Sequence, residues 1–213
     1  NFDYGPIFFF FLYNEVEGVR LRAGGRTYFG TDDSWRVQGY TAYGFKDDKF
    51  KYGFSGKWMV DRKNRLILSG GNRRDIEQIG ASLTATYDVL GRSSASSSVF
   101  TSGSNGKLTA INLSNVAIEM EPVKNLTFQT GFSYRTLESA SPTFSLDYYT
   151  DVANGIVKSD VKQSEASLQV DYTPKRKTIG FAVERQTVDS PYSRFFVNYS
   201  HGFKGLLDSD FQY

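Results

Sequence analysis

Hydrophobic and polar residues alternate along much of the chain with a period of two, which is typical of β-strands that have one apolar and one polar face. The alternation is clear where Val19 and Leu21 flank Arg20. It recurs at residues 35–45 and 50–60, and charged turns separate these segments. The pattern predicts consecutive antiparallel strands joined in a meander.

Later segments repeat this pattern within a single domain that covers residues 1–213. Further strands are expected at residues 4–12, 65–71, 107–120, 126–137, 163–172, 177–186 and 194–203. About nine or ten strands are therefore visible. Two long connections, residues 74–106 and 138–162, are rich in Ser, Gly, Asn and Asp, and counting strands places both on the same side. Outer-membrane barrels combine short turns on one side with long loops on the other.

The apolar phase of the first three strands is expected to face lipid. Its members are Val19, Leu21, Trp35, Val37, Tyr43, Phe54 and Trp58. Aromatic residues make up 16% of the chain, although the mean hydropathy is −0.41. A barrel with aromatic girdles and a polar interior has this mixture. The fold class expected is all-β, an antiparallel transmembrane β-barrel.

The polar phase of the same strands predicts a charged lumen. The basic arc comprises Arg20, Arg22, Arg26, Arg36, Lys51 and Lys57, and the acidic arc comprises Glu165, Asp171 and Glu184. Opposite walls, or a plug between them, could pair these charges and rigidify the barrel. Alternatively, the charges could form a constriction that selects a solute or holds a peptide segment. Of the two, we favour pairing.

One connection has a different period. Apolar residues recur there at every third or fourth position, namely Ile76, Ile79, Leu83, Tyr87 and Leu90. This spacing is that of one helical face. It predicts a short amphipathic helix over residues 75–91 that lies over or inside the barrel mouth.

Composition excludes several classes of function. A net charge of +2 without a basic run gives no support for nucleic-acid binding, and the absence of cysteine removes disulfides and thiolate chemistry. The longest apolar run, residues 6–13, is far shorter than the ~20 residues of a membrane helix. The one histidine, His201, forms no catalytic pair with the neighbouring Ser200, because adjacent residues of a strand face opposite sides. No enzyme activity, catalytic residue, cofactor or metal site is expected.

Four stretches, residues 13–27, 39–47, 50–53 and 199–205, resemble an uncharacterised outer-membrane family of Bacteroidota. Members of that family carry a carboxypeptidase-regulatory-like β-sandwich ahead of a barrel that is distantly similar to BamA. The resemblance implies a bacterial outer-membrane location, and it implies no activity and no site residue. Because Phe211, Gln212 and Tyr213 would begin another strand, we expect the chain to be a segment of a larger barrel.

The leading interpretation is an integral outer-membrane β-barrel protein, a non-enzymatic component of outer-membrane protein assembly, export or surface-complex scaffolding. Its expected partners are outer-membrane lipid and other envelope proteins. One alternative is a solute channel or a barrel enzyme, and stable ion currents from the isolated protein would favour a channel. Another is a soluble β-sandwich binding protein, which would need the faces assigned to lipid to pack on one another.

Overall fold

The computed structural model describes residues 2–4, 11–27, 32–78, 108–141, 144–151, 153–188 and 193–213. Most of these residues form one ten-stranded sheet. Its strands are β1 (Phe2–Tyr4), β2 (Phe11–Asn14), β3 (Gly18–Thr27), β4 (Trp35–Gly44), β5 (Lys49–Asp61), β6 (Leu66–Gln78), β7 (Leu108–Val123), β8 (Leu126–Ser139), β11 (Asp160–Tyr172) and β14 (Phe195–Phe203).

Two short hairpins lie outside this sheet. Strand β9 (Tyr148–Asp151) pairs with β10 (Ile156–Lys158), and β12 (Thr178–Ile179) pairs with β13 (Gln186–Thr187). A 3-10 turn, η2 (Leu206–Asp208), follows β14. Among the described residues, no helix is both long enough and apolar enough to cross a membrane.

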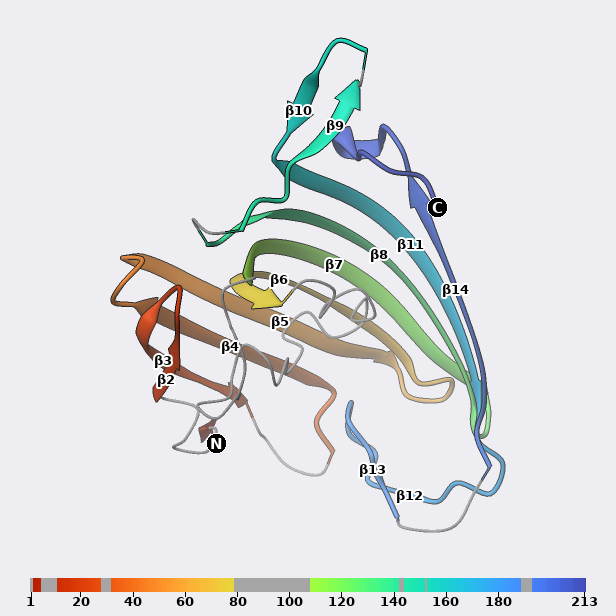
Figure 1. Ribbon diagram of the computed structural model, residues 1–213. Coiled ribbons are helices and arrows are strands. Elements are labelled where there is room, and N and C mark those ends of the chain that lie inside the picture. Colours follow the sequence, from red (N-terminus) through yellow and green to blue (C-terminus); the bar gives the residue numbers. More distant parts are fainter. Residues whose placement is uncertain are drawn as a thin grey trace.

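The strand order is β3-β4-β5-β6-β7-β8-β11-β14, and both β1 and β2 pair with β3. Each of these pairs is antiparallel, so the predicted all-β antiparallel meander is confirmed. Figure 1 shows that the sheet is strongly curved, with the β12–β13 hairpin below its hollow side. In the part of the chain that the structure describes, the sheet does not close on itself, because β14 is not paired with β1 or β2.

The curvature crowds the concave face of the sheet, and glycine makes room there. A Cβ atom on Gly24 would lie 2.5 Å from the Cβ atom of Tyr40 on the neighbouring strand. Gly24 therefore permits a close approach of two strands.

The prediction of a helix over residues 75–91 is wrong for residues 75–78. Residues 75–78 form the end of β6 and pair with residues 108–111 of β7. Their alternation has a period of two, since the side chains of Asp75 and Glu77 are buried on the concave face with Arg73. The remaining residues of the predicted helix, 79–91, lie outside the described part of the chain.

The predicted strand at residues 177–186 is also wrong. Gly180 adopts a positive φ of 92° and interrupts the extended backbone, so that the segment divides between β12 and β13. The connection from β11 to β14 therefore spans residues 173–194. It leaves the sheet beside the tight turn at residues 124–125, where the Thr173 N–H donates to the Asn125 carbonyl. The end of the sheet with short turns thus carries one long connection, contrary to the predicted asymmetry.

Candidate functional site: the charged concave face

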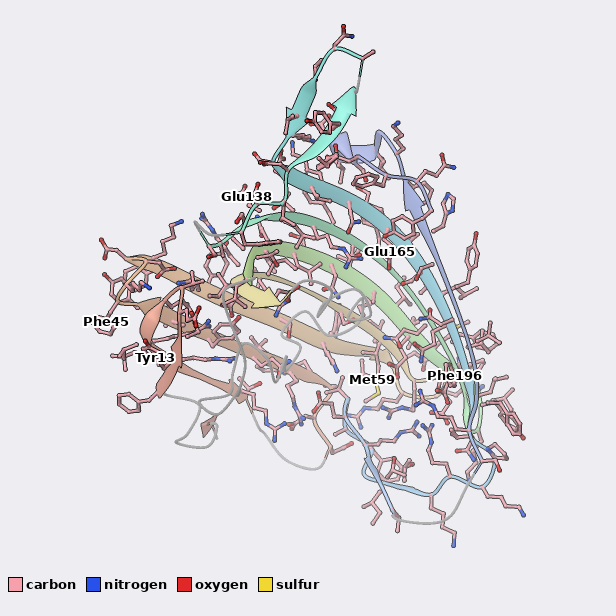
Figure 2. The ribbon with its side chains drawn as sticks, in the orientation of Figure 1. Tyr13, Phe45, Met59, Glu138, Glu165 and Phe196 are labelled. Atoms are coloured by element: carbon pink, nitrogen blue, oxygen red, sulfur yellow. The ribbon has the colours of Figure 1, made fainter. Side chains whose placement is uncertain are left out.

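The residues predicted to face lipid all lie on the convex face. In the register of the sheet, Leu21 faces Tyr43 and Trp35 faces Trp58, while Phe54 faces Gly39 beside Val37. Large apolar side chains on this face are exposed, with 54% of Phe54 and 57% of Trp58 accessible. Figure 2 shows Tyr13 and Phe45 extending outward at one margin of the sheet. Contact with lipid stays a prediction.

The basic residues predicted to line a lumen share the concave face. The register places Arg22 opposite Ala42, Arg26 opposite Gln38 and Arg36 opposite Lys57. Arg20 and Lys51 belong to the same set, because they face Gly44 and Ala42. Side chains on one face of a strand repeat every second residue, so the alternation in the sequence was sufficient to predict that these basic residues share a face.

Arg20 is the centre of a buried ion-pair network near the end of the sheet with long loops. Its side chain is 1% exposed and donates to both carboxylate oxygens of Asp75, at 2.7 and 2.9 Å. It also contacts Glu17 at 3.2 Å, and the Tyr40 hydroxyl donates to Asp75. Arg20 is on β3 and Asp75 on β6, about 14 Å apart if three strand spacings lay flat. The contact therefore requires the curvature of the sheet.

Lys51 and Arg22 extend this network. The Lys51 ammonium lies 2.6 Å from Glu17 and 2.5 Å from Asp47. The Arg22 guanidinium lies over the Tyr40 ring, 3.7 Å from its centroid. Arg20 and Lys51 of the basic arc thus have their counter-charges on nearby strands and turns rather than on an opposite wall.

Glu165 and Asp171, the acidic residues of the predicted arc, also have local partners on the concave face. Arg135 on β8 donates to Glu165 at 2.8 Å, and the Tyr213 hydroxyl donates to the same carboxylate at 2.6 Å. Arg194 donates to Asp171 at 2.5 Å. Figure 2 places Glu165 on β11.

The sequence predicted that Glu184 lies on a strand of the large sheet, and this prediction is wrong. Glu184 belongs to residues 181–185, which we call the inturned segment, between β12 and β13. Its carboxylate pairs with Arg36 and lies 3.4 Å from Lys57. Burial alone would raise the pKa of Glu184, but Lys57 and Arg36 together lower it below its ordinary value.

The inturned segment is fixed to the sheet at the end with short turns. The Arg65 guanidinium donates to the carbonyls of Ala182 and Val183 at 3.2 and 3.3 Å. The Val183 side chain is 4% exposed and packs with Met59 and Ile67. Figure 2 shows Met59 between the sheet and the β12–β13 hairpin.

Several charged residues of this face were not identified from the sequence. Glu17, Asp75 and Arg135 are buried ion-pair partners, and Glu121 holds Arg185 of the inturned segment. A signal for Asp75 was present, because Arg73, Asp75 and Glu77 occupy one phase of a strand. Within the described residues, no group of three or more His, Cys, Asp or Glu side chains could hold a metal ion.

Comparison with known proteins gives one finding. A family described as "Family of unknown function (DUF5686) C-terminal domain" matches residues 1–213, which is the whole chain. The comparisons with curated proteins and with solved structures found no match.

Proposed function

We propose, for a chain that belongs to this DUF5686 C-terminal domain family, that it forms part of the wall of a bacterial outer-membrane β-barrel. In this proposal the convex face contacts lipid, and the concave face lines the interior. The protein serves as a non-enzymatic component of outer-membrane protein assembly, export or surface-complex scaffolding. One observation carries the proposal: large apolar side chains are exposed on one face of the sheet while charged side chains are buried on the other.

The arrangement of aromatic residues on the convex face supports a membrane. Trp35 and Trp58 lie side by side at the end of the sheet with short turns, whereas at the other end Tyr43 contacts Phe45 edge-to-face and Phe50 at a tilt. Trp35 and Tyr43 are near opposite ends of β4, which at about 3.3 Å per residue places them about 26 Å apart. The apolar band of an outer-membrane barrel is about 25 Å tall and has aromatic girdles at both margins.

The concave face supports an interior rather than one layer of a soluble sandwich. A sandwich buries apolar side chains between its two sheets, whereas here the side of the sheet with buried residues carries Arg20, Lys51, Arg135 and Glu165. Ile67, Ile111 and Leu113 are buried among these charges, but the large aromatic side chains, such as Phe54 and Trp58, are on the exposed side. A polar lumen within a lipid-facing wall has this inverted distribution.

The pairing of the buried charges supports a scaffolding or assembly role. The buried carboxylates that we describe are ion-paired, and the inturned segment lies across one end of the concave face. Fixed pairs rigidify a wall and leave few charges for an open conduction path. The distant likeness to assembly barrels supports the same role by analogy.

Quenching of tryptophan fluorescence by brominated lipids tests the proposal. The chain has two tryptophans, Trp35 and Trp58, and both are on the convex face. In liposomes of brominated phospholipid, we expect strong quenching relative to ordinary phospholipid. A control variant that carries Trp35→Phe, Trp58→Phe and Gln38→Trp moves the reporter to the concave face and should be quenched much less. Equal fluorescence of the native protein in both lipids would contradict the proposal.

A further inference from the structure

The inturned segment is bound to the sheet partly through its backbone, as a peptide ligand is. Arg65 donates to the Ala182 and Val183 carbonyls, and the Val183 N–H donates to the Asp33 carbonyl at 2.7 Å. Hydrogen bonds of this kind recognise the main chain of a bound segment, here with bends at residues 181–184, whatever its side chains are.

Side-chain contacts add a short sequence preference to this recognition. Ala182 is buried, and Val183 fills the space between Met59 and Ile67. The next residue, Glu184, lies between Arg36 and Lys57. We call the surrounding residues the cradle; they are Asp33, Arg36, Lys57, Met59, Arg65 and Ile67. The cradle accepts a small residue, a β-branched residue and a carboxylate in succession.

The hairpin that carries the segment is held together by few backbone pairs. Strands β12 and β13 pair through only two residue pairs, Thr178 with Thr187 and Ile179 with Gln186. An isolated two-stranded hairpin is marginally stable in water. Phe181, at the start of the segment, is 78% exposed and contributes little to its anchoring. The segment can therefore leave the cradle without disrupting the large sheet.

From these contacts we infer that the cradle is a peptide-binding site, which the inturned segment fills until a peptide of another protein displaces it. The ligand class is a peptide that adopts the bent backbone of residues 181–184 and carries a small apolar residue, a β-branched residue and an acidic residue in sequence. That the ligand comes from an envelope protein rests on the proposed function. Binding itself does not depend on lipid, so failure of this inference and failure of the proposed function are distinguishable.

Fluorescence anisotropy with a labelled peptide of residues 179–187 tests the inference on the full chain in detergent. A site that its own segment fills nine-tenths of the time binds about tenfold more weakly than an empty one. The double variant Val183→Gly, Glu184→Gln removes two of the three anchoring side chains, keeps the ion pair of Arg185 with Glu121, and leaves the cradle intact. We expect it to bind the peptide at least about tenfold more tightly than the native protein does. Adding Arg65→Gln should abolish this binding.

A matched control comes from the same hairpin. Ile179→Gly with Thr187→Gln changes two exposed residues, and this variant should bind as weakly as the native protein. Equal peptide affinity in the native protein and in Val183→Gly, Glu184→Gln would overturn the inference, as would binding that survives Arg65→Gln.

A second measurement avoids destabilising variants. The chain has no cysteine, so Val183→Cys gives a single thiol at a buried position. If the peptide displaces the inturned segment, excess peptide should accelerate maleimide labelling of this thiol. A labelling rate that the peptide does not change would also overturn the inference.

Discussion

Arg20 shows how a single buried charge depends on its neighbours in this protein. Its guanidinium makes two hydrogen bonds to Asp75 and contacts Glu17, and these side chains are almost completely inaccessible to water. Removing one partner of a buried ion pair is strongly destabilising, because the remaining charge stays buried without compensation.

We therefore expect Arg20→Ala to lower the free energy of unfolding by about 3–5 kcal/mol. The reason is that Asp75 and Glu17 would lose their shared cation. Urea titration of the folded protein in detergent measures the loss. Arg74→Ala, an exposed position on the opposite face of β6, is the matched control and should change stability by no more than about 0.5 kcal/mol. Similar losses in the two variants would show that the network does not stabilise the fold.

The sequence predicted which face each of these residues occupies but not which residues pair. Arg20, Arg22 and Arg36 were placed correctly because alternation alone determines the face of a strand. Their acidic partners were missed because Asp75 reaches Arg20 across two intervening strands. Such a contact depends on the curvature of the whole sheet, which local alternation does not encode.

Among the structural elements, the inturned segment is expected to respond to pH through Glu184. Glu184 is held between Arg36 and Lys57, and its pKa is below the ordinary value of about 4.3. A carboxylate whose pKa falls on folding stabilises the folded form above its ordinary pKa. That contribution is lost as the pH falls through the lowered pKa.

We expect hydrogen-exchange protection of the Val183 amide, corrected for intrinsic rates, to be constant above about pH 5 and to fall as the medium becomes more acidic. This amide reports on the segment because it donates to the Asp33 carbonyl. Glu184→Gln is the control, and its protection should be low already at neutral pH. The same acid-induced loss in native protein and Glu184→Gln would exclude Glu184 as the titrating group.

The two wrong predictions of secondary structure came from local sequence patterns that are typical of a different element. The helical spacing of Ile76 and Ile79 obscured the strand that continues to Gln78. Alternation at residues 177–186 concealed the break at Gly180, whose positive φ ends the extended chain. In both cases contacts with distant residues, Asp75 with Arg20 and Val183 with Met59, determined the outcome.

The apolar band on the convex face predicts that an arginine on β4 and an arginine on β7 have different effects on stability. Val37→Arg should destabilise the lipid-inserted protein by about 2–4 kcal/mol, because it places a charge within the band. Asn112→Arg is on the same face of β7 but beside the polar side chains of Asn72 and Ser114, so its effect should be much smaller. Refolding titrations into lipid vesicles measure both. Equal losses would contradict the position assigned to the band.

For the whole molecule, the sequence predicted an antiparallel meander with one apolar and one charged face, and the register of Leu21 with Tyr43 and of Trp35 with Trp58 agrees with it. Closure of the sheet could not be predicted, because it depends on which strand pairs with β14. At the edge of β14 that pairs with no other strand of the described structure, Tyr213 and Gly202 exchange two backbone hydrogen bonds. Residues 211–213 form no strand in the structure, however, so the further strand expected there stays a prediction.

The most direct test of the two-faced wall is a nitroxide scan along β5 in lipid bilayers. Single cysteines from Lys51 to Trp58, each spin-labelled, report accessibility to oxygen, which concentrates in lipid, and to a water-soluble nickel complex. We expect oxygen accessibility to alternate with a period of two, with maxima at Tyr52, Phe54 and Trp58 and minima at Lys51, Ser55 and Lys57. Uniform accessibility along the strand, or maxima at the charged positions, would contradict the assignment of the convex face to lipid.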